Sequence, residues 1–147
     1  MAVGVQTRRA VAYIEINQPG QAHRATGFLT SDTVFMTNQH VIESVDDALS
    51  ARVFFDRELD VTRVPLPGTS FRLDLLRFFT TSPASELDYT VVAIGARITG
   101  PVRSADLGYC PVSPQGAKHA LGMNINILQH PNRQYKQVAL RNNLLTF

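Results

Sequence analysis

Two ionisable side chains stand at the ends of strand-like segments, where a side chain can be held rigidly and still reach solvent. His40 follows two short apolar strands joined by the turn Ser31-Asp32-Thr33, and Asp88 opens the apolar run that ends at Ile94. A histidine on such a support can act as a general base, and a neighbouring carboxylate can orient it and stabilise its charged form. Each residue also has a plainer interpretation: a surface histidine after a strand, and an aspartate that caps a turn.

The other candidates for chemistry are less well placed. Cys110 is followed by a proline and lacks a glycine-rich turn, so we expect it to be a buried or half-buried small apolar residue. Glu86 lies two residues before Asp88 and is the alternative acid on the same face. The remaining histidines have no partner at metal-ligand spacing; they are His23, His119 and His130. We therefore expect no metal ion and no cofactor.

Short strands are the elements that must position these side chains. Alternating and apolar runs bounded by turn residues predict strands at 10–16, 24–31, 34–37, 51–56, 71–79 and 89–95. One helical segment is expected at 41–49, because its apolar residues recur at helical spacing. Many short strands separated by turns are typical of an all-β barrel or sandwich.

The C-terminal quarter of the sequence is separated from the rest by a segment rich in turn formers. Residues 110–116 contain two prolines and a glycine, which favours a connector between two lobes. Two further strands are expected at 124–129 and 135–141, with a hairpin turn at 130–133. His130 then belongs to a turn, where a structural role is the simpler interpretation.

Composition excludes several classes of function. The 147 residues are 44% hydrophobic and 18% charged, with a net charge of +2, as in a folded globular protein. The sequence lacks the concentrated basic face with interleaved aromatics that would predict nucleic-acid binding. No apolar run reaches the roughly 18 residues needed to span a membrane. The single cysteine forbids an internal disulfide, and residues 1–16 lack the pattern of a signal peptide. We therefore expect a cytoplasmic protein.

Three blocks of the sequence resemble one family. The segment from Gly27-Phe-Leu to Met36-Thr-Asn-Gln-His40-Val-Ile resembles the histidine block of trypsin-like (chymotrypsin-fold) serine peptidases, and Leu87-Asp88-Tyr-Thr-Val-Val resembles their aspartate block. Residues 127–140 are similar to a strand pair of the second barrel in the bacterial and fungal branch that includes glutamyl endopeptidases. The resemblance implies a double β-barrel with a complete first barrel at 1–100, a connector at 101–118 and a partial second barrel at 119–147.

The resemblance also implies a function and a gap in it. His40 matches the general base and Asp88 the orienting carboxylate of a serine endopeptidase that cleaves a polypeptide substrate. The nucleophile of the family is a serine in a Gly-x-Ser-Gly turn, and none of the eight serines here is followed by glycine. We therefore expect this chain to be inactive alone and to be completed by a downstream segment or a complementary chain. The alternative is a non-catalytic module of the same ancestry that binds a polypeptide or regulates a partner.

Overall fold

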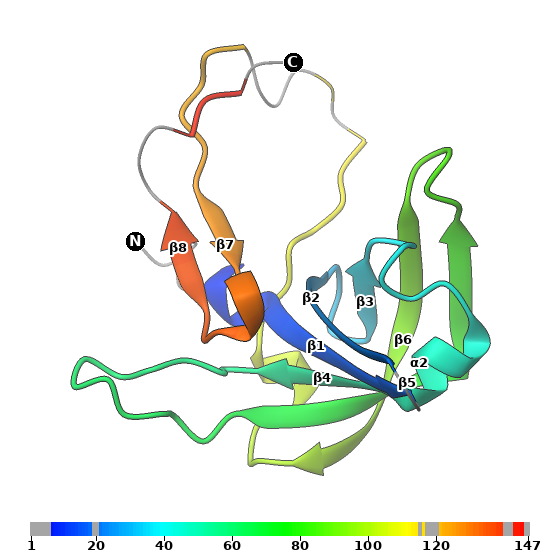
Figure 1. The fold of residues 1–147 in the computed structure, drawn as a ribbon, viewed down its shortest axis with the longest axis horizontal. Helices are drawn as coiled ribbons and strands as arrows, with labels where there is room; N and C mark the ends of the chain where they lie inside the picture. The colour runs from blue at the N-terminus through cyan, green and yellow to red at the C-terminus, as the bar shows by residue number, and fades with distance from the viewer. Residues whose placement is uncertain (1–6, 19–20, 115, 117–120, 140–142, 146–147) are drawn as a thin grey trace.

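Strands dominate the structure, a computed structural model that describes residues 7–18, 21–114, 116, 121–139 and 143–145. Within these residues, six strands form a closed antiparallel barrel in the order β1-β2-β3-β6-β5-β4 (Figure 1). The six are β1 Val11–Gln18, β2 Gln21–Leu29, β3 Val34–Thr37, β4 Ala51–Phe55, β5 Thr69–Ser82 and β6 Tyr89–Thr99. Each overlaps a strand expected from the sequence, which confirms the all-β prediction.

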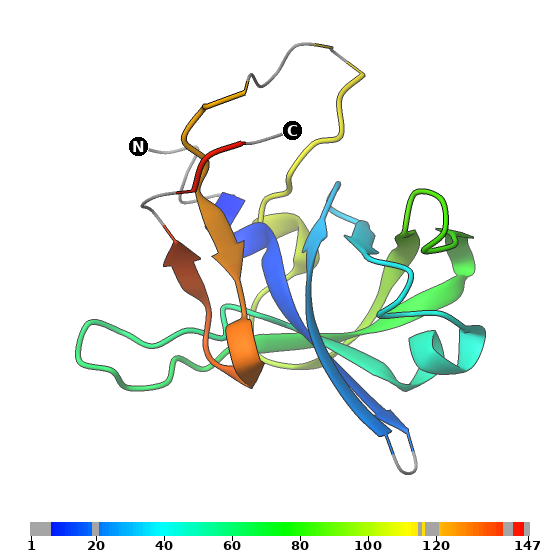
Figure 2. The same ribbon diagram turned by 45° about the horizontal axis from the view of Figure 1, so that its top comes forward.

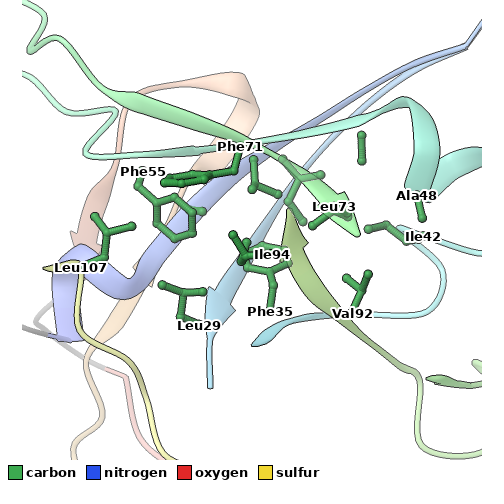
Figure 3. Close-up of a cluster of buried hydrophobic side chains, with 14 of the residues drawn as sticks. Leu29, Phe35, Ile42, Ala48, Phe55, Phe71, Leu73, Val92, Ile94 and Leu107 are labelled. Atoms are coloured by element: carbon green, nitrogen blue, oxygen red, sulfur yellow. The ribbon is translucent and has the colours of Figure 1, made fainter. Parts of the chain in front are cut away.

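Aromatic rings form the centre of the barrel core. Phe35 and Phe55 meet edge to face with ring centroids 6.2 Å apart, and Phe55 meets Phe71 in the same way at 5.8 Å (Figure 3). Such pairs contribute about 0.5–1.5 kcal/mol beyond the burial of their area. Phe35 belongs to β3, so the strand that precedes His40 is anchored in the core.

The long strand β5 departs from the regular alternation expected at 71–79. Asp74 pairs with Ala93, yet Phe79 pairs with the adjacent Val92, so residues 75–78 bulge out of the ladder. Leu76 is consequently fully exposed. A β-bulge of this kind bends the strand and increases its twist, as closing a small barrel requires.

The helix begins later than the expected 41–49. Helix α2 spans Val45–Ser50, and Ser44 is its N-cap in a capping box with Asp47. The residues before it form a turn, in which the backbone N–H groups of Val41 and Ile42 donate to the Asn38 carbonyl. The reason is local: a capping box fixes where a helix starts, whatever apolar spacing precedes it.

Beyond the barrel, the described chain forms the start of a second sheet. Strands β7 Ile127–Gln129 and β8 Gln137–Ala139 pair antiparallel, and the 3-10 turn η2 Pro131–Arg133 joins them. These are the strands expected at 124–129 and 135–141, shortened, and residues 140 and 141 lie outside the described part. A complete first barrel and a partial second sheet are thus confirmed. The domain limits at 100 and 118 stay a prediction.

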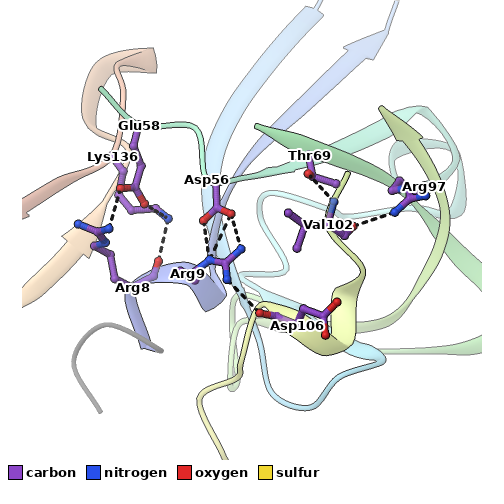
Figure 4. Close-up of polar contacts among 9 residues, drawn as sticks. All are labelled: Arg8, Arg9, Asp56, Glu58, Thr69, Arg97, Val102, Asp106 and Lys136. Carbon is purple, nitrogen blue, oxygen red and sulfur yellow. Dashed lines mark hydrogen bonds and ion pairs between the residues drawn. The ribbon is translucent and has the colours of Figure 1, made fainter. Parts of the chain in front are cut away.

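Ion pairs join the β7–β8 hairpin to the barrel. The hairpin stands beside the beginning of β1, on the side of the barrel away from α2 (Figure 2). The side chain of Lys136 is 2% exposed, and its Nζ donates to the Arg8 carbonyl at 2.7 Å and to Glu58 Oε1 at 3.1 Å (Figure 4). Arg57 donates to the carbonyl of Gln134 at 2.9 Å. Charged groups from the β4–β5 loop therefore hold the second sheet in place.

Candidate active site

His40 is positioned by the turn that follows β3. The Thr37 hydroxyl at the end of that strand donates to the Thr26 carbonyl at 3.0 Å, which ties β3 to β2. On the other side of His40, the Ile42 side chain is fully buried, and its carbonyl accepts a 2.8 Å hydrogen bond from the Thr90 hydroxyl. The loop that carries His40 is thus fixed at both ends.

Asp88 reaches the same place from the other direction. It directly precedes β6, and the pairing of Thr37 with Thr90 sets the end of β3 beside the start of β6. Residues 48 positions apart in the chain are therefore neighbours. The Asp88 backbone has a φ of 48°, a left-handed conformation that is uncommon outside glycine, although aspartate tolerates it better than most residues.

The two side chains are hydrogen-bonded to each other. His40 Nδ1 lies 2.8 Å from Asp88 Oδ2, and the His40 backbone N–H donates to Asp88 Oδ1 at 3.1 Å. Since a carboxylate only accepts, Nδ1 carries a proton, and in the neutral imidazole the lone pair then lies on Nε2. The His40 side chain is 58% exposed and that of Asp88 is 25% exposed. An approaching molecule can therefore reach the imidazole, while the carboxylate is partly covered.

Hydrogen bonds keep Asp88 ionised. The backbone N–H of His40 is the largest influence that lowers the pKa of Asp88, and the side chains of His40 and Asn38 lower it further against the cost of desolvation. A carboxylate that accepts several donors is stabilised in its charged form. The charge that would stabilise a protonated His40 is thus in place.

The plainer interpretation of Asp88, a cap of its own turn, does not match the contacts, while His40 is an exposed histidine after a strand in either interpretation. Both oxygens of the Asp88 carboxylate accept from His40, so this side chain binds across two loops and does not cap its own turn. The alternative acid, Glu86, accepts instead from the Ser82 hydroxyl at 3.3 Å.

Two neighbours of His40 make contacts that sequence reasoning missed. Asn38 Nδ2 donates to Asp88 Oδ2 at 3.1 Å, and Gln39 Oε1 accepts from the backbone N–H of Ala84 at 3.2 Å. Both side chains join the His40 turn to the β5–β6 loop. The sequence did contain a signal for these contacts. Two amide side chains stand between the strand and the histidine, and they are long enough to form hydrogen bonds to a neighbouring loop.

The depression beside His40 holds no free serine among the described residues that line it. Its volume is about 280 Å³, and its lining includes His23, Glu43 and Ser44. The Ser44 hydroxyl donates to Asp47 Oδ2 at 2.8 Å and accepts from the Asp47 backbone N–H. Ser44 therefore caps α2 and is not placed to attack a substrate.

The remaining sequence candidates lie away from this pair or outside the described residues. Cys110 is half-buried, packs against the core, and has its pKa raised by desolvation, so its thiol stays protonated. His130 precedes η2 in the hairpin turn, as expected, and is 5% exposed. His119 lies outside the described residues. No group of three or more potential metal ligands occurs in the described part of the chain.

The fold agrees with the comparison to family models. The chain belongs to the family described as the trypsin-like peptidase domain, whose model matches residues 25–146. Membership establishes a protease-like class, while the glutamyl-endopeptidase branch stays a prediction.

Two known proteins resemble this one. An uncharacterised protein named y4fB from Sinorhizobium fredii (strain NBRC 101917 / NGR234) is 38% identical over 143 residues, which cover 95% of this chain and 22% of that protein. The chain thus spans about a fifth of the length of this relative. A solved structure titled "Structure of GrC" has a TM-score of 0.57 at 14% identity, covering 84% of this chain and 52% of that one. At that identity the likeness shows the fold alone.

None of the described helices has both the length and the apolar character needed to span a membrane.

Proposed function

We propose that this domain supplies the general base and the orienting carboxylate of a serine endopeptidase. The 2.8 Å contact between His40 Nδ1 and Asp88 Oδ2 carries the proposal, because it fixes the tautomer that a base requires. Family membership and the barrel fold support the same class. The substrate is the peptide bond of a polypeptide.

The proposed chemistry follows from the two nitrogens of His40. Nε2 takes the proton of a serine hydroxyl as that oxygen attacks the scissile carbonyl carbon. The resulting imidazolium is stabilised by the Asp88 carboxylate, and it then donates the proton to the leaving amine. A water molecule repeats the sequence to release the acyl group, with His40 again acting as the base.

The serine and the oxyanion hole are proposed to come from outside these residues. The sequence contains no Gly-x-Ser-Gly turn, and that turn would supply both the nucleophile and the backbone N–H donors to the developing oxyanion. A missing oxyanion donor alone typically costs about 100- to 1,000-fold in kcat. The isolated 147-residue chain is therefore proposed to be inactive.

The test uses the complete gene product that contains these residues, with a fluorophosphonate probe and a quenched peptide library. We expect labelling of a serine and peptide cleavage, both abolished by His40→Ala. Asp88→Asn keeps the shape but loses the charge, and we expect a fall of about 10⁴-fold in kcat, as is typical of this dyad. Glu86→Gln is the matched control, since Glu86 binds Ser82 and not His40.

The opposite results separate this function from the alternative. Labelling that survives His40→Ala would overturn the role of His40. Tight binding of a polypeptide without labelling or cleavage would instead favour the non-catalytic module. The isolated chain, tested alongside, is expected to remain unlabelled.

A further inference from the structure

Asn38 makes two contacts to Asp88 that the proposed reaction leaves without a role. It directly follows β3, and its Nδ2 lies 3.1 Å from Asp88 Oδ2 and 3.3 Å from the Asp88 backbone carbonyl. We propose that Asn38 is a positioning residue that fixes the Asp88 carboxylate against the ring of His40. The inference rests on the proposed function for its consequence in catalysis, although the positioning can be measured separately.

The first argument concerns the rotation of the carboxylate. The terminal torsion of aspartate is broad, so a carboxylate without fixed donors turns easily about its last bond. Here Oδ1 accepts from the His40 backbone, and Oδ2 accepts from the His40 ring. Asn38 donates to the same Oδ2 from the start of the turn that carries His40, next to the end of β3. The third donor thus holds the oxygen that faces Nδ1, even when the exposed ring moves.

The second argument concerns the backbone of Asp88. Its left-handed conformation, with a φ of 48°, is strained for a residue with a side chain and persists only where surrounding contacts support it. One support is the Asp88 N–H, which donates to the Pro83 carbonyl at 3.1 Å within the loop. The other is the Asn38 amide, which binds the Asp88 carbonyl from outside the loop. One amide group therefore stabilises both the backbone conformation and the side chain it directs.

Gln39 is the matched control for this role. Its side chain also joins the two loops, but it accepts from Ala84, four positions before Asp88, and makes no contact with the carboxylate. Loss of Gln39 should loosen the loop without removing a donor from Asp88. Any effect of Asn38 that Gln39 does not share is then specific to the carboxylate.

The experiment measures the carboxylate and the ring directly on the isotope-labelled chain of 147 residues. The Asp88 side-chain ¹³C shift gives its titration midpoint, and the His40 ring ¹⁵N shifts give the tautomer. We expect Asn38→Ala to raise the Asp88 midpoint by about 0.5 pH unit or more, because a hydrogen bond to the charged form is lost. The fraction of His40 protonated at Nε2 should rise as well. Asn38→Asp keeps the size of the side chain but replaces the donor with a negative charge, so its shift should be larger.

The outcomes distinguish the positioning role from the peptidase function. Gln39→Ala should titrate as the unaltered chain does. Wild-type midpoints and tautomers in both Asn38 variants would overturn the positioning role, even if the complete gene product cleaves peptides. Shifted midpoints in a gene product that no fluorophosphonate labels would support positioning and sink the peptidase function. In an active gene product, Asn38→Ala should lower kcat and leave KM within about twofold, since only transition-state stabilisation is lost.

Discussion

At the scale of single residues, two histidines of this protein are held in opposite ways. The exposed His40 donates to a carboxylate, whereas His130 is buried, with its ring centre 5.5 Å from that of Tyr13 and its Nδ1 in contact with the Gln134 carbonyl. Desolvation, together with the positive charges of Lys136 and Arg57, lowers the pKa of His130 to about 4. His130 therefore stays neutral near pH 7 and contributes to packing, while His40 has the partner that stabilises its charged form.

The neutral His130 should make the fold sensitive to acid. Between its ordinary pKa of 6.5 and its folded pKa of about 4, only the unfolded chain binds the proton, so stability falls as pH decreases through this window. The loss should reach about 2–3 kcal/mol near pH 4. Urea unfolding at pH 7, 5.5 and 4.5 measures it. His130→Gln should remove this part of the slope, and His23→Gln, at an exposed position, should keep it. Equal slopes in all three proteins would contradict the assignment.

At the scale of elements, Gly27 explains how β2 and β3 pack beneath the site. A Cβ at this position would collide with the Phe35 ring and lie 2.8 Å from the Met36 carbonyl oxygen. Gly27→Ala should therefore destabilise the barrel by about 1–3 kcal/mol, as overpacking does. Gly116→Ala is the control, because no atom of the described residues lies within 4 Å of its added Cβ. Thermal unfolding measures both, and a Gly27→Ala barrel as stable as the Gly116→Ala chain would show that β3 can shift.

The elements also show which features the sequence could predict. Period-two patterns located the barrel strands, and the positions of His40 and Asp88 at strand ends indicated a pair. The sequence patterns do not show that β3 lies beside β6. This pairing results from closure of the barrel and cannot be inferred from either strand alone. The helix start could have been read from Ser44 and Asp47 as a capping box. The amide side chains of Asn38 and Gln39 could have indicated cross-loop bonds, but the sequence offers no signal for the left-handed backbone of Asp88, whose carbonyl the Asn38 amide contacts.

At the scale of the whole molecule, the second sheet depends on charges buried at its junction with the barrel. Glu58 is 8% exposed and pairs with both Lys136 and Arg8. Desolvation lowers the pKa of Lys136, while Glu58 opposes that shift by favouring the charged amine. Arg57 adds a stacked contact, with its guanidinium carbon 4.1 Å from the Tyr13 ring centre and 4.8 Å from that of Tyr135. The hairpin is therefore held mainly by charged side chains, which are stable in this buried position only while they are paired.

Removal of one charge should open this junction without melting the barrel. Glu58→Gln leaves the Lys136 amine buried without its carboxylate, which typically costs about 3–5 kcal/mol for a buried pair. Hydrogen exchange should then accelerate at the amides of β7 and β8 and stay slow in β6. Adding Lys136→Met to Glu58→Gln removes the unpaired charge and should recover part of the protection, because apolar replacement of a buried pair is often tolerated. Exchange that rises equally in β6 would mean that the two sheets unfold as one unit. Unchanged exchange in the hairpin would mean that the stacked Arg57 holds it without the Lys136 pair.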